Sequence, residues 1–421
     1  MLTTTYSSAP PAVTRRAWLG AGLALAAAGW GANQFSPMIV FYTERIGLSA
    51  TVADAMFGLY ALGLIPALLA GGRLSDRTGR RGVIMTALLA SFLATVLLIA
   101  GGAEPSLLYA GRFLTGVASG LAFGAGAAWV KELSQEAGDP SAGPMRATVA
   151  MTAGFAAGPL VAGLCAQWLP DPAVTAYLPH LLVLAAVTVP AWRTPDPGRA
   201  AAGSPHQAAT APRPRGMARY FVLVMLPFAP WVFGTAAIAL AYLPALAAPR
   251  VGHQALLFSA LDTGLAALAG IAAQPLARFA RHLRPGRMVT AAMTLVLAGI
   301  GFAAWAAATL SLPLIFLASA VLGVAYGITQ LTGLTEVTRI AGARSLGTAT
   351  ATYQVLSYTG FALPFLMSLA SSHLSLTPPA LLLMLLGAAA AAAGWLALAA
   401  SRTAGTTAGN RQGSGAGRPE R

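Results

Sequence analysis

The chain alternates between long apolar stretches and short polar turns. Each apolar stretch is about 20 residues long, which is the length that an α-helix needs to cross the hydrocarbon core of a bilayer. Charged residues make up only 9% of the sequence, and most of them lie between the stretches. The pattern predicts an all-α polytopic membrane protein with twelve spans. These spans are 18–42, 51–71, 82–101, 106–130, 146–168, 174–192, 219–247, 255–277, 287–310, 312–335, 346–371 and 377–400.

Basic residues are distributed unevenly over the predicted connections. Of the 26 Lys and Arg residues, Arg45 and Arg250 fall in outer loops, Arg112 falls inside a span, and the others fall on the side of the two termini. Since cytoplasmic segments are enriched in Lys and Arg, both termini are predicted to be cytoplasmic, with the protein in the inner (cytoplasmic) membrane. The net charge of +14 then faces anionic lipid, so we expect no nucleic-acid partner.

Residues 194–218 interrupt the apolar pattern and divide the chain into two halves. This segment is rich in Pro, Ala, Gly and Arg and has no hydrophobic periodicity, which is typical of a linker. It separates two predicted six-helix bundles, 17–193 and 219–400. The polar ends, 1–16 and 401–421, are predicted to be disordered and cytoplasmic.

Short sequences recur in the two predicted bundles in the same order. Gly116-Val-Ala-Ser-Gly120 returns as Gly323-Val-Ala-Tyr-Gly327, and the Gly-Phe-Ala that begins at Gly154 returns at nearly the same offset. Such a duplication predicts two pseudo-symmetric halves. It is typical of transporters whose binding site lies between the halves.

The beginning of the first apolar stretch allows another interpretation. Arg15-Arg16 followed by an Ala/Leu run looks like a twin-arginine secretion signal, which would be cleaved near Ala28. The apolar run continues beyond that point to Tyr42, however, and eleven more apolar stretches follow. We therefore assign the run to the first span.

Charge is concentrated in ten residues, 72–81, between the second and third spans. This turn resembles the signature loop between helices 2 and 3 of the major facilitator superfamily, G-x-L-[A/S]-D-R-x-G-R-[K/R]. A basic loop that only follows the positive-inside rule is the alternative. The residues that match the defining positions are Gly72, Leu74, Asp76, Arg77, Gly79, Arg80 and Arg81.

The resemblance implies two bundles that rock around a central site, and a loop that stabilises the outward-open state. Asp76 is then expected to pair with Arg77 or Arg80. It would also face the N-terminus of helix 11 near Ser345, where the helix dipole favours an anion. Glu132, at the inner end of helix 4, would share Arg77 with Asp76 as a charge-relay partner.

Two charged residues lie inside predicted spans, where charge is costly and often functional. Arg112 begins a segment that resembles the helix 4 motif of the superfamily, whose arginine is implicated in proton transfer or in orienting the substrate. Asp262 is placed near mid-membrane, where an acid can take up and release a proton. We expect both to serve proton coupling. The alternatives are that Arg112 snorkels to the outer headgroups and that Asp262 is structural. Asp54 and Glu44 fall near the outer ends of their spans, as ordinary mouth residues would.

The fifth span carries a series of small residues around a proline, Gly154, Gly158, Pro159 and Gly163. It resembles the Gly-Pro motif of the drug and antiporter branches of the superfamily. Small residues four apart are also common wherever membrane helices pack closely, which is the alternative interpretation.

The fold that the resemblance implies has helices 1, 4, 7 and 10 around its central cavity. Polar and aromatic residues of these helices and of helix 11 are therefore the substrate-binding candidates, although each is also suited to bonds between helices. No second buried charge accompanies them on helices 1, 7 and 10, which favours a hydrophobic or weakly polar solute. His180, His253 and His373 fall at outer ends, without the spacing of a metal site. The candidates are Asn33, Gln34, Trp231, Tyr242, Tyr326, Gln330, Tyr353, Gln354 and Tyr358.

The sequence thus predicts a monomeric secondary transporter, a proton-coupled exporter of a small organic compound that uses the proton gradient and no cofactor. A proton symporter or facilitator for sugars or other metabolites is the alternative within the family. A membrane enzyme is disfavoured because the chain lacks H-E-x-x-H, G-x-S-x-G and P-loop motifs. A non-transporting receptor of the same fold would be expected to lose the charges inside the membrane.

Overall fold

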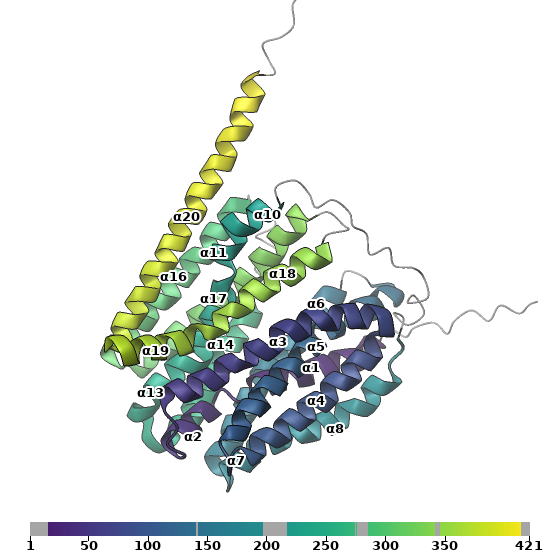
Figure 1. Ribbon diagram of the computed structural model, residues 1–421, viewed down its shortest axis with the longest axis vertical. Helices are drawn as coiled ribbons and strands as arrows, with labels where there is room; N and C mark the ends of the chain where they lie inside the picture. Colours follow the sequence, from purple (N-terminus) through teal and green to yellow (C-terminus); the bar gives the residue numbers. More distant parts are fainter. Residues whose placement is uncertain are drawn as a thin grey trace, which may run out of the picture.

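The computed structural model describes residues 16–139, 142–196, 217–273, Pro275, 285–341 and 346–413. All regular elements within these ranges are helices, as the sequence predicts. Figure 1 shows the helices of the first half, purple to blue, as one bundle beside the green to yellow helices of the second half.

The first bundle contains one broken helix, four long helices and two shorter ones. Its elements are α1 (Trp18–Asn33), α2 (Met38–Glu44), α3 (Ala50–Thr78), α4 (Arg80–Ala100), α5 (Ser106–Glu136), α6 (Gly143–Trp168), α7 (Pro172–Thr175) and α8 (Leu178–Arg193).

The second bundle begins with an irregular helix and ends with the longest one. Its α-helices are α10 (Met217–Tyr220), α11 (Leu226–Phe228), α12 (Pro230–Ala237), α13 (Leu243–Val251), α14 (Ala255–Ala273), α16 (Pro285–Thr309), α17 (Leu312–Ile340), α18 (Leu346–Tyr358), α19 (Leu363–Leu374) and α20 (Pro378–Gly413). Wider or tighter turns join some of them: η1 (Phe221–Met225), η2 (Ile238–Tyr242), η3 (Gly252–Gln254) and η5 (Thr359–Ala362).

Ten helical segments of the described residues are long and apolar enough to cross a membrane. One of them, Met217–Ala273, contains two predicted spans and turns at Gly252, whose φ of +52° suits a residue without a side chain. The predicted span 18–42 is divided between α1 and α2, because Pro37 has no N–H to continue a helix from the residues before it. The membrane character is confirmed, whereas the count of twelve spans and the orientation of the termini stay predictions.

Proline also explains the wide turns of the helix that starts at α10. The π-helical turns η1 and η2 lie just before Pro227 and Pro244. A proline ring collides with the carbonyl group four residues earlier in an α-helix, and a widened turn relieves that collision. The same helix provides pocket residues, as described below.

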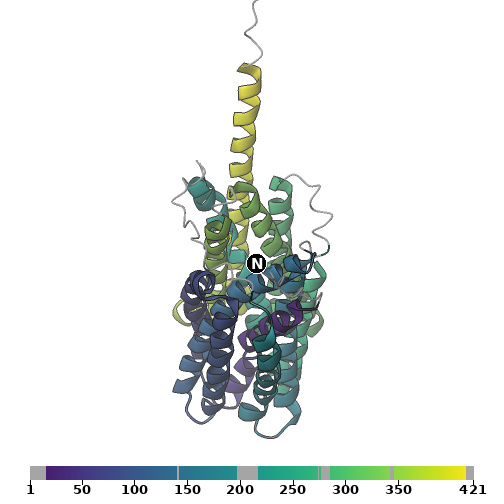
Figure 2. The same ribbon diagram turned by 90° about the vertical axis from the view of Figure 1, so that its right-hand side faces the viewer.

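The described structure differs from the sequence prediction at two helix ends. The expected loop 72–81 is almost entirely helical, since α3 continues to Thr78 and α4 starts at Arg80. Gly79 alone makes the reversal, with a φ of +93° that few other residues adopt, so that Gly72 needs no special conformation. The tail predicted to be disordered from residue 401 is helical to Gly413, and Figures 1 and 2 show α20 projecting beyond the bundles. Extending an existing helix is much easier than starting one.

The repeated glycine pairs have the same packing role in both bundles. A Cβ at Gly116 of α5 would collide with the carbonyl group of Tyr60 on α3. A Cβ at Gly323 of α17 would likewise collide with the carbonyl group of Ala266 on α14. The repeat therefore preserves a close contact between the second and fourth helix of each half.

We expect Gly116→Ala and Gly323→Ala to lower the melting temperature in detergent, because overpacking a tight contact costs about 1–3 kcal/mol. Gly301→Ala is the matched control, since a Cβ there meets no atom within 4 Å. Thermal unfolding followed by size-exclusion fluorescence measures the difference. Equal melting temperatures for all three variants would contradict the packing role.

Candidate functional site

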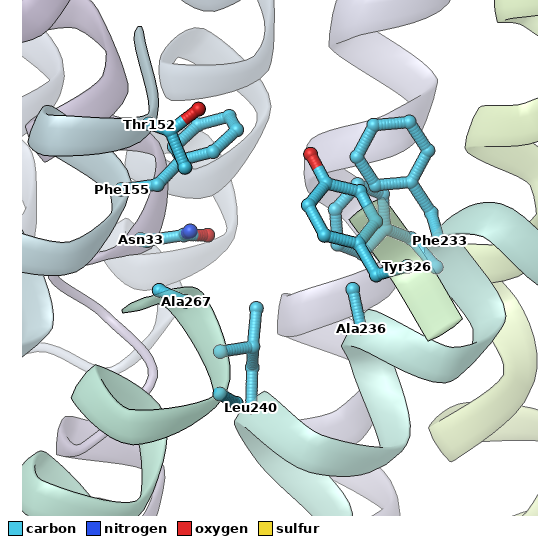
Figure 3. Close-up of a pocket in the computed structure, with 10 residues that line it drawn as sticks. Asn33, Thr152, Phe155, Phe233, Ala236, Leu240, Ala267 and Tyr326 are labelled. Atoms are coloured by element: carbon cyan, nitrogen blue, oxygen red, sulfur yellow. The ribbon is translucent and has the colours of Figure 1, made fainter. Parts of the chain in front are cut away.

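A pocket of about 380 Å³, its open mouth included, lies where the two bundles meet. Asn33 on α1 and Phe155 on α6 belong to the first half, and Phe233 on α12 and Tyr326 on α17 belong to the second. Figure 3 shows Asn33 and Tyr326 on opposite sides of this space. The residues that line the pocket are Asn33, Thr152, Phe155, Phe233, Ala236, Leu240, Ala266, Ala267, Tyr326 and Phe361.

Aromatic rings form most of the pocket wall of the second half. Phe233 stacks on Tyr358 with ring centres 4.3 Å apart and on Phe361 with ring centres 4.8 Å apart. Phe361 also meets Phe57 and Tyr60 of α3 edge to face, at 5.6 Å in both cases. Because α3 belongs to the first half, Phe361 joins the two bundles beside the pocket. The wall suits apolar and aromatic groups, and the pocket-lining residues carry no charge.

The structure brings only part of the predicted cavity set to this pocket. Asn33 and Tyr326 line it, and Tyr358 supports it from behind Phe233. Gln330 instead donates a hydrogen bond to Gln354, and the Tyr353 hydroxyl donates to the carbonyl of Thr329. These three side chains join α17 to α18, so they have the helix-to-helix role that was the alternative to substrate binding. Trp231 and Tyr242 are outside the residues that line the pocket.

Sequence reasoning did not single out the pocket residues Thr152, Phe155, Phe233 and Phe361. A signal for two of them was present, because Phe155 and Phe361 are the central residues of the repeated Gly-Phe-Ala. Their equivalent positions in the two halves place them on facing walls of the same space.

Gln34 turns away from the pocket into a buried polar cluster of the first half. Its amide nitrogen lies 3.1 Å from Nδ1 of His180 and 3.4 Å from the Thr95 hydroxyl. The Nε2 atom of His180 lies 3.1 Å from the Ala27 carbonyl oxygen. His180 lies in the first turn of α8, at the outer helix end where the sequence placed it, but it is fully buried. The start of α8 packs against α1, which covers the ring.

Arg112 is buried inside the first bundle, with 1% of its surface exposed, so it does not snorkel to the headgroups. Its guanidinium donates hydrogen bonds to the carbonyl oxygens of Met56 at 3.2 Å and Ala32 at 3.3 Å. The rings of Phe35 and Tyr60 lie over it, with centres 4.7 Å and 5.0 Å from its Cζ. Carbonyl oxygens and ring faces thus stabilise this cation and fix its position. Tyr60 links it to Phe361 at the pocket.

Asp262 is fully buried between α14 and α17, one helical turn from the pocket residue Ala266. The Ser319 hydroxyl donates a hydrogen bond of 2.8 Å to Oδ2 of its carboxyl group. The other oxygen, Oδ1, has no hydrogen-bond partner within the described residues. A buried acid with a free oxygen is well suited to proton exchange, although Asp262 does not line the pocket itself.

The helix 5 motif contacts both halves of the molecule. A Cβ at Gly154 would collide with the Ala26 carbonyl, and one at Gly158 would meet Trp30, so both glycines allow α6 to approach α1. Gly163 faces the other half, where a Cβ would collide with Ala260 of α14. Pro159 lies within α6 between these contacts.

Arg80 of the signature loop is the arginine that Asp76 and Glu132 share. It forms ion pairs with Asp76 and, at 2.8 Å, with Glu132. The expected sharing of Arg77 is therefore wrong, because Arg80 begins α4 and its side chain lies between the two acids. The expected partner Ser345 is outside the described residues. Following the predicted topology, we call the end of the molecule that carries the signature loop the inner end and the opposite one the outer end.

The first residues of the predicted linker bind the same turn. Asp196 accepts hydrogen bonds from the backbone N–H groups of Arg80 and Arg81, at 3.0 Å and 3.1 Å. Arg81 donates to the Thr194 carbonyl at 2.9 Å, and Trp129 donates its indole N–H to Pro195 at 2.7 Å. Asp196 thus caps the N-terminus of α4, whose first N–H groups have no partner within the helix.

The second half has a buried acid with two partners at its inner end. Glu336, with 3% of its surface exposed, accepts a 2.6 Å hydrogen bond from Tyr220 and pairs with Arg339 at 2.7 Å. These contacts join the end of α10 to the last turns of α17. Within the described part of the chain, no three His, Cys, Asp or Glu side chains are grouped as metal ligands would be.

We expect Asp196→Ala to lower the stability by about 1 kcal/mol, because α4 loses a charged cap. The bonds that hold the linker start would weaken as well. Trypsin should then cleave faster after the exposed Arg193 under native conditions. Asp196→Asn keeps an acceptor and should have a smaller effect on both the melting temperature and the cleavage rate. Cleavage at the parent rate in Asp196→Ala would show that the cap does not hold the linker.

Comparison with solved structures agrees with this arrangement of helices. The chain is similar to the POT family transporter PepTSo, with a TM-score of 0.73, 14% identity, and coverage of 92% of this chain and 98% of that one. It is also similar to a mutant of the nucleoside transporter NupG, with a TM-score of 0.69, 14% identity, and coverage of 91% and 99%. A POT family transporter in complex with 5-aminolevulinic acid gives a TM-score of 0.68, 11% identity, and coverage of 94% and 97%.

At these identities the comparison shows a shared fold alone. A sequence search among curated proteins found no match. A sequence model of the Major Facilitator Superfamily, however, matches residues 19–364. The family and the similar structures are transporters, which agrees with the expectation that the protein is not an enzyme. The resemblance of the signature loop is thus confirmed at the level of the superfamily, and the chain belongs to the major facilitator superfamily of membrane transporters.

Proposed function

We propose that this transporter exports a small hydrophobic or weakly polar organic compound in exchange for protons, by alternating access to the pocket between its halves. The observation that carries this proposal is the pocket wall, which consists mainly of aromatic and aliphatic groups and has no charged side chain. A strongly charged solute would find no counter-ion there to offset its desolvation. An aromatic or aliphatic solute would be stabilised by ring contacts.

Asn33 and Tyr326, which have polar groups on opposite walls, would orient the bound compound. Asn33 belongs to the first half and Tyr326 to the second, so a compound that binds both contacts both bundles at once. Such a contact changes when the halves move apart, which is how binding can favour one conformation.

Asp262 is the proposed proton carrier, and Arg112 is the proposed fixed charge of the first half. Neither lines the pocket, so both would act on the helices around it: α14 and α17 for Asp262, and α1, α3 and α5 for Arg112. The signature turn, through Asp76, Arg80 and Glu132, would control the exchange between conformations and leave substrate choice to the pocket.

The proposal also includes the direction of transport, the membrane in which the protein lies and its monomeric state. The Gly158-Pro159 sequence favours the antiporter branch, and the distribution of basic residues favours the inner membrane with both termini cytoplasmic. A monomer would suffice, since the pocket lies within one chain. Proton symport or facilitated uptake of a metabolite is the alternative, which the direction of transport in vesicles separates from export.

The substrate is best sought by comparing the susceptibility of cells with and without the protein to a panel of compounds. We expect resistance to apolar, weakly polar compounds and no effect on multiply charged ones. Tyr326→Phe removes only a hydroxyl group, so it should weaken binding by about tenfold for compounds that bear a hydrogen-bonding group. Compounds without such a group should bind equally well. Equal losses for both sets would contradict the orienting role of Tyr326.

We expect Asp262→Asn to abolish transport driven by a pH gradient in reconstituted vesicles, while counterflow of substrate continues. Asn cannot take up and release a proton but keeps an acceptor for Ser319. Asp171→Asn is the matched control, because Asp171 is exposed in a left-handed conformation that Asn tolerates. Gradient-driven transport at the parent rate in Asp262→Asn would refute the proton role.

A further inference from the structure

One side chain at the outer end of the molecule joins the two halves by both of its polar atoms. Gln167 lies in the last turn of α6, in the first half. Its Nε2 donates a 2.7 Å hydrogen bond to the carbonyl oxygen of His253, in the second half. Its Oε1 accepts a 3.1 Å hydrogen bond from the backbone N–H of Leu257. Both the nitrogen and the oxygen of the amide group thus bond to the second half.

These two bonds satisfy backbone groups that have few alternatives. Leu257 is the third residue of α14, and the first N–H groups of a helix have no acceptor within it. A helix usually receives such a bond from a side chain just before it in the sequence. Here the acceptor comes from the other bundle, so the Leu257 N–H keeps this partner only while the outer ends of the halves are together.

From Gln167 toward the middle of the membrane, α6 and α14 pack closely against each other. Gly163 lies one turn from Gln167 on α6, and a Cβ there would collide with the Cβ of Ala260 and lie 3.1 Å from the Leu256 carbonyl oxygen. At Gly264 of α14, the nearest atom of the other half, Cδ1 of Leu160, lies 3.9 Å from the Cβ position. The contact therefore runs from Leu160 to Gln167, with small residues in its middle and the amide group at its outer end.

A second hydrogen bond joins the halves at the same end but through other helices. The hydroxyl groups of Thr51, near the start of α3, and Ser368, on α19, are 3.1 Å apart. Ser368 also forms a hydrogen bond with the carboxyl group of Asp54 on α3. These bonds join side chains to each other, whereas Gln167 satisfies two backbone groups of the other half.

We infer that Gln167 is a positioning residue that holds the outer ends of the two halves closed. Alternating access requires that these ends separate, and both bonds of Gln167 must then break. The inference rests on the proposed motion of the halves and not on the substrate, the coupling ion or the direction of transport. Replacing the side chain should favour the outward-open conformation.

Distances between spin labels test this directly. The labels are placed at Ala103→Cys, in the first half, and Ala308→Cys, in the second, both exposed near outer helix ends, with Cys165→Ser to remove the native thiol. Gln167→Ala should raise the ratio of long to short distances about tenfold over the parent, which corresponds to about 1.4 kcal/mol. Two hydrogen bonds with ordinary net contributions account for such a shift.

Three further variants separate the amide group from general packing. Gln167→Glu keeps the acceptor for Leu257 but loses the donor to His253, so its ratio should lie between those of the parent and Gln167→Ala. Gly163→Ala adds a clashing Cβ without changing the amide, and should favour the open state independently. Gln135→Ala, at an exposed position at the inner end of α5, is the matched control and should leave the ratio unchanged.

An unchanged ratio in Gln167→Ala, while Gly163→Ala increases it, would assign closure to packing alone and overturn the role of Gln167. A ratio in Gln167→Glu equal to that in Gln167→Ala would also count against the bond from Leu257. A single label distance in the parent under all conditions would overturn the proposed motion itself, and with it the inference.

Discussion

A polar group inside a bilayer has no water to bind, and this constraint explains the partners of the main buried polar side chains of the transporter. Backbone groups are satisfied within helices, so the remaining partners must come from neighbouring helices. Arg112 uses the carbonyl groups of α1 and α3, His180 uses that of Ala27, and Asp262 uses the Ser319 hydroxyl. Each such bond fixes two helices relative to each other. The polar residues of the interior therefore define the two bundles, and the apolar rings are left to line the pocket between them.

Close helix contacts make these short bonds possible. Gly116 in the first half and Gly323 in the second bring the equivalent helix pairs together, and α6 uses its glycines to approach α1 on one side and α14 on the other. The helix α6, which packs closely against helices of both halves, also carries Gln167. Rigid packing within each half, with a few separable contacts between the halves, is the arrangement that two alternative conformations require.

The sequence was sufficient to predict the helical membrane fold, the duplication and the superfamily, because these depend on periodicity, charge distribution and a dense motif. It placed Asn33 and Tyr326 at the pocket correctly, but not Gln34, Gln330 or Gln354. Whether an amide faces a cavity or a neighbouring helix depends on the rotation of each helix, which hydropathy does not determine when a helix is apolar on all sides. His180 was placed correctly near a helix end, but its burial against α1 was not predicted. The sequence assigned the shared charge to Arg77 instead of Arg80, because it did not show that the chain reverses at the single residue Gly79 and so places Arg80 beside the acids.

That single-residue turn has a mechanical consequence. α3 has 29 residues and is about 43 Å long, and its outer end meets the second half at Thr51 while its inner end adjoins Gly79. A flexible loop after Thr78 would absorb any tilt of this helix. Only Gly79 separates the two helices, and the ion pair between Arg80 and Asp76 also joins them. A tilt of α3 is therefore expected to move the start of α4. The outer contact and the signature turn thus lie at the two ends of one continuous helix, so that a displacement of α3 at one face of the membrane also moves the start of α4 at the other.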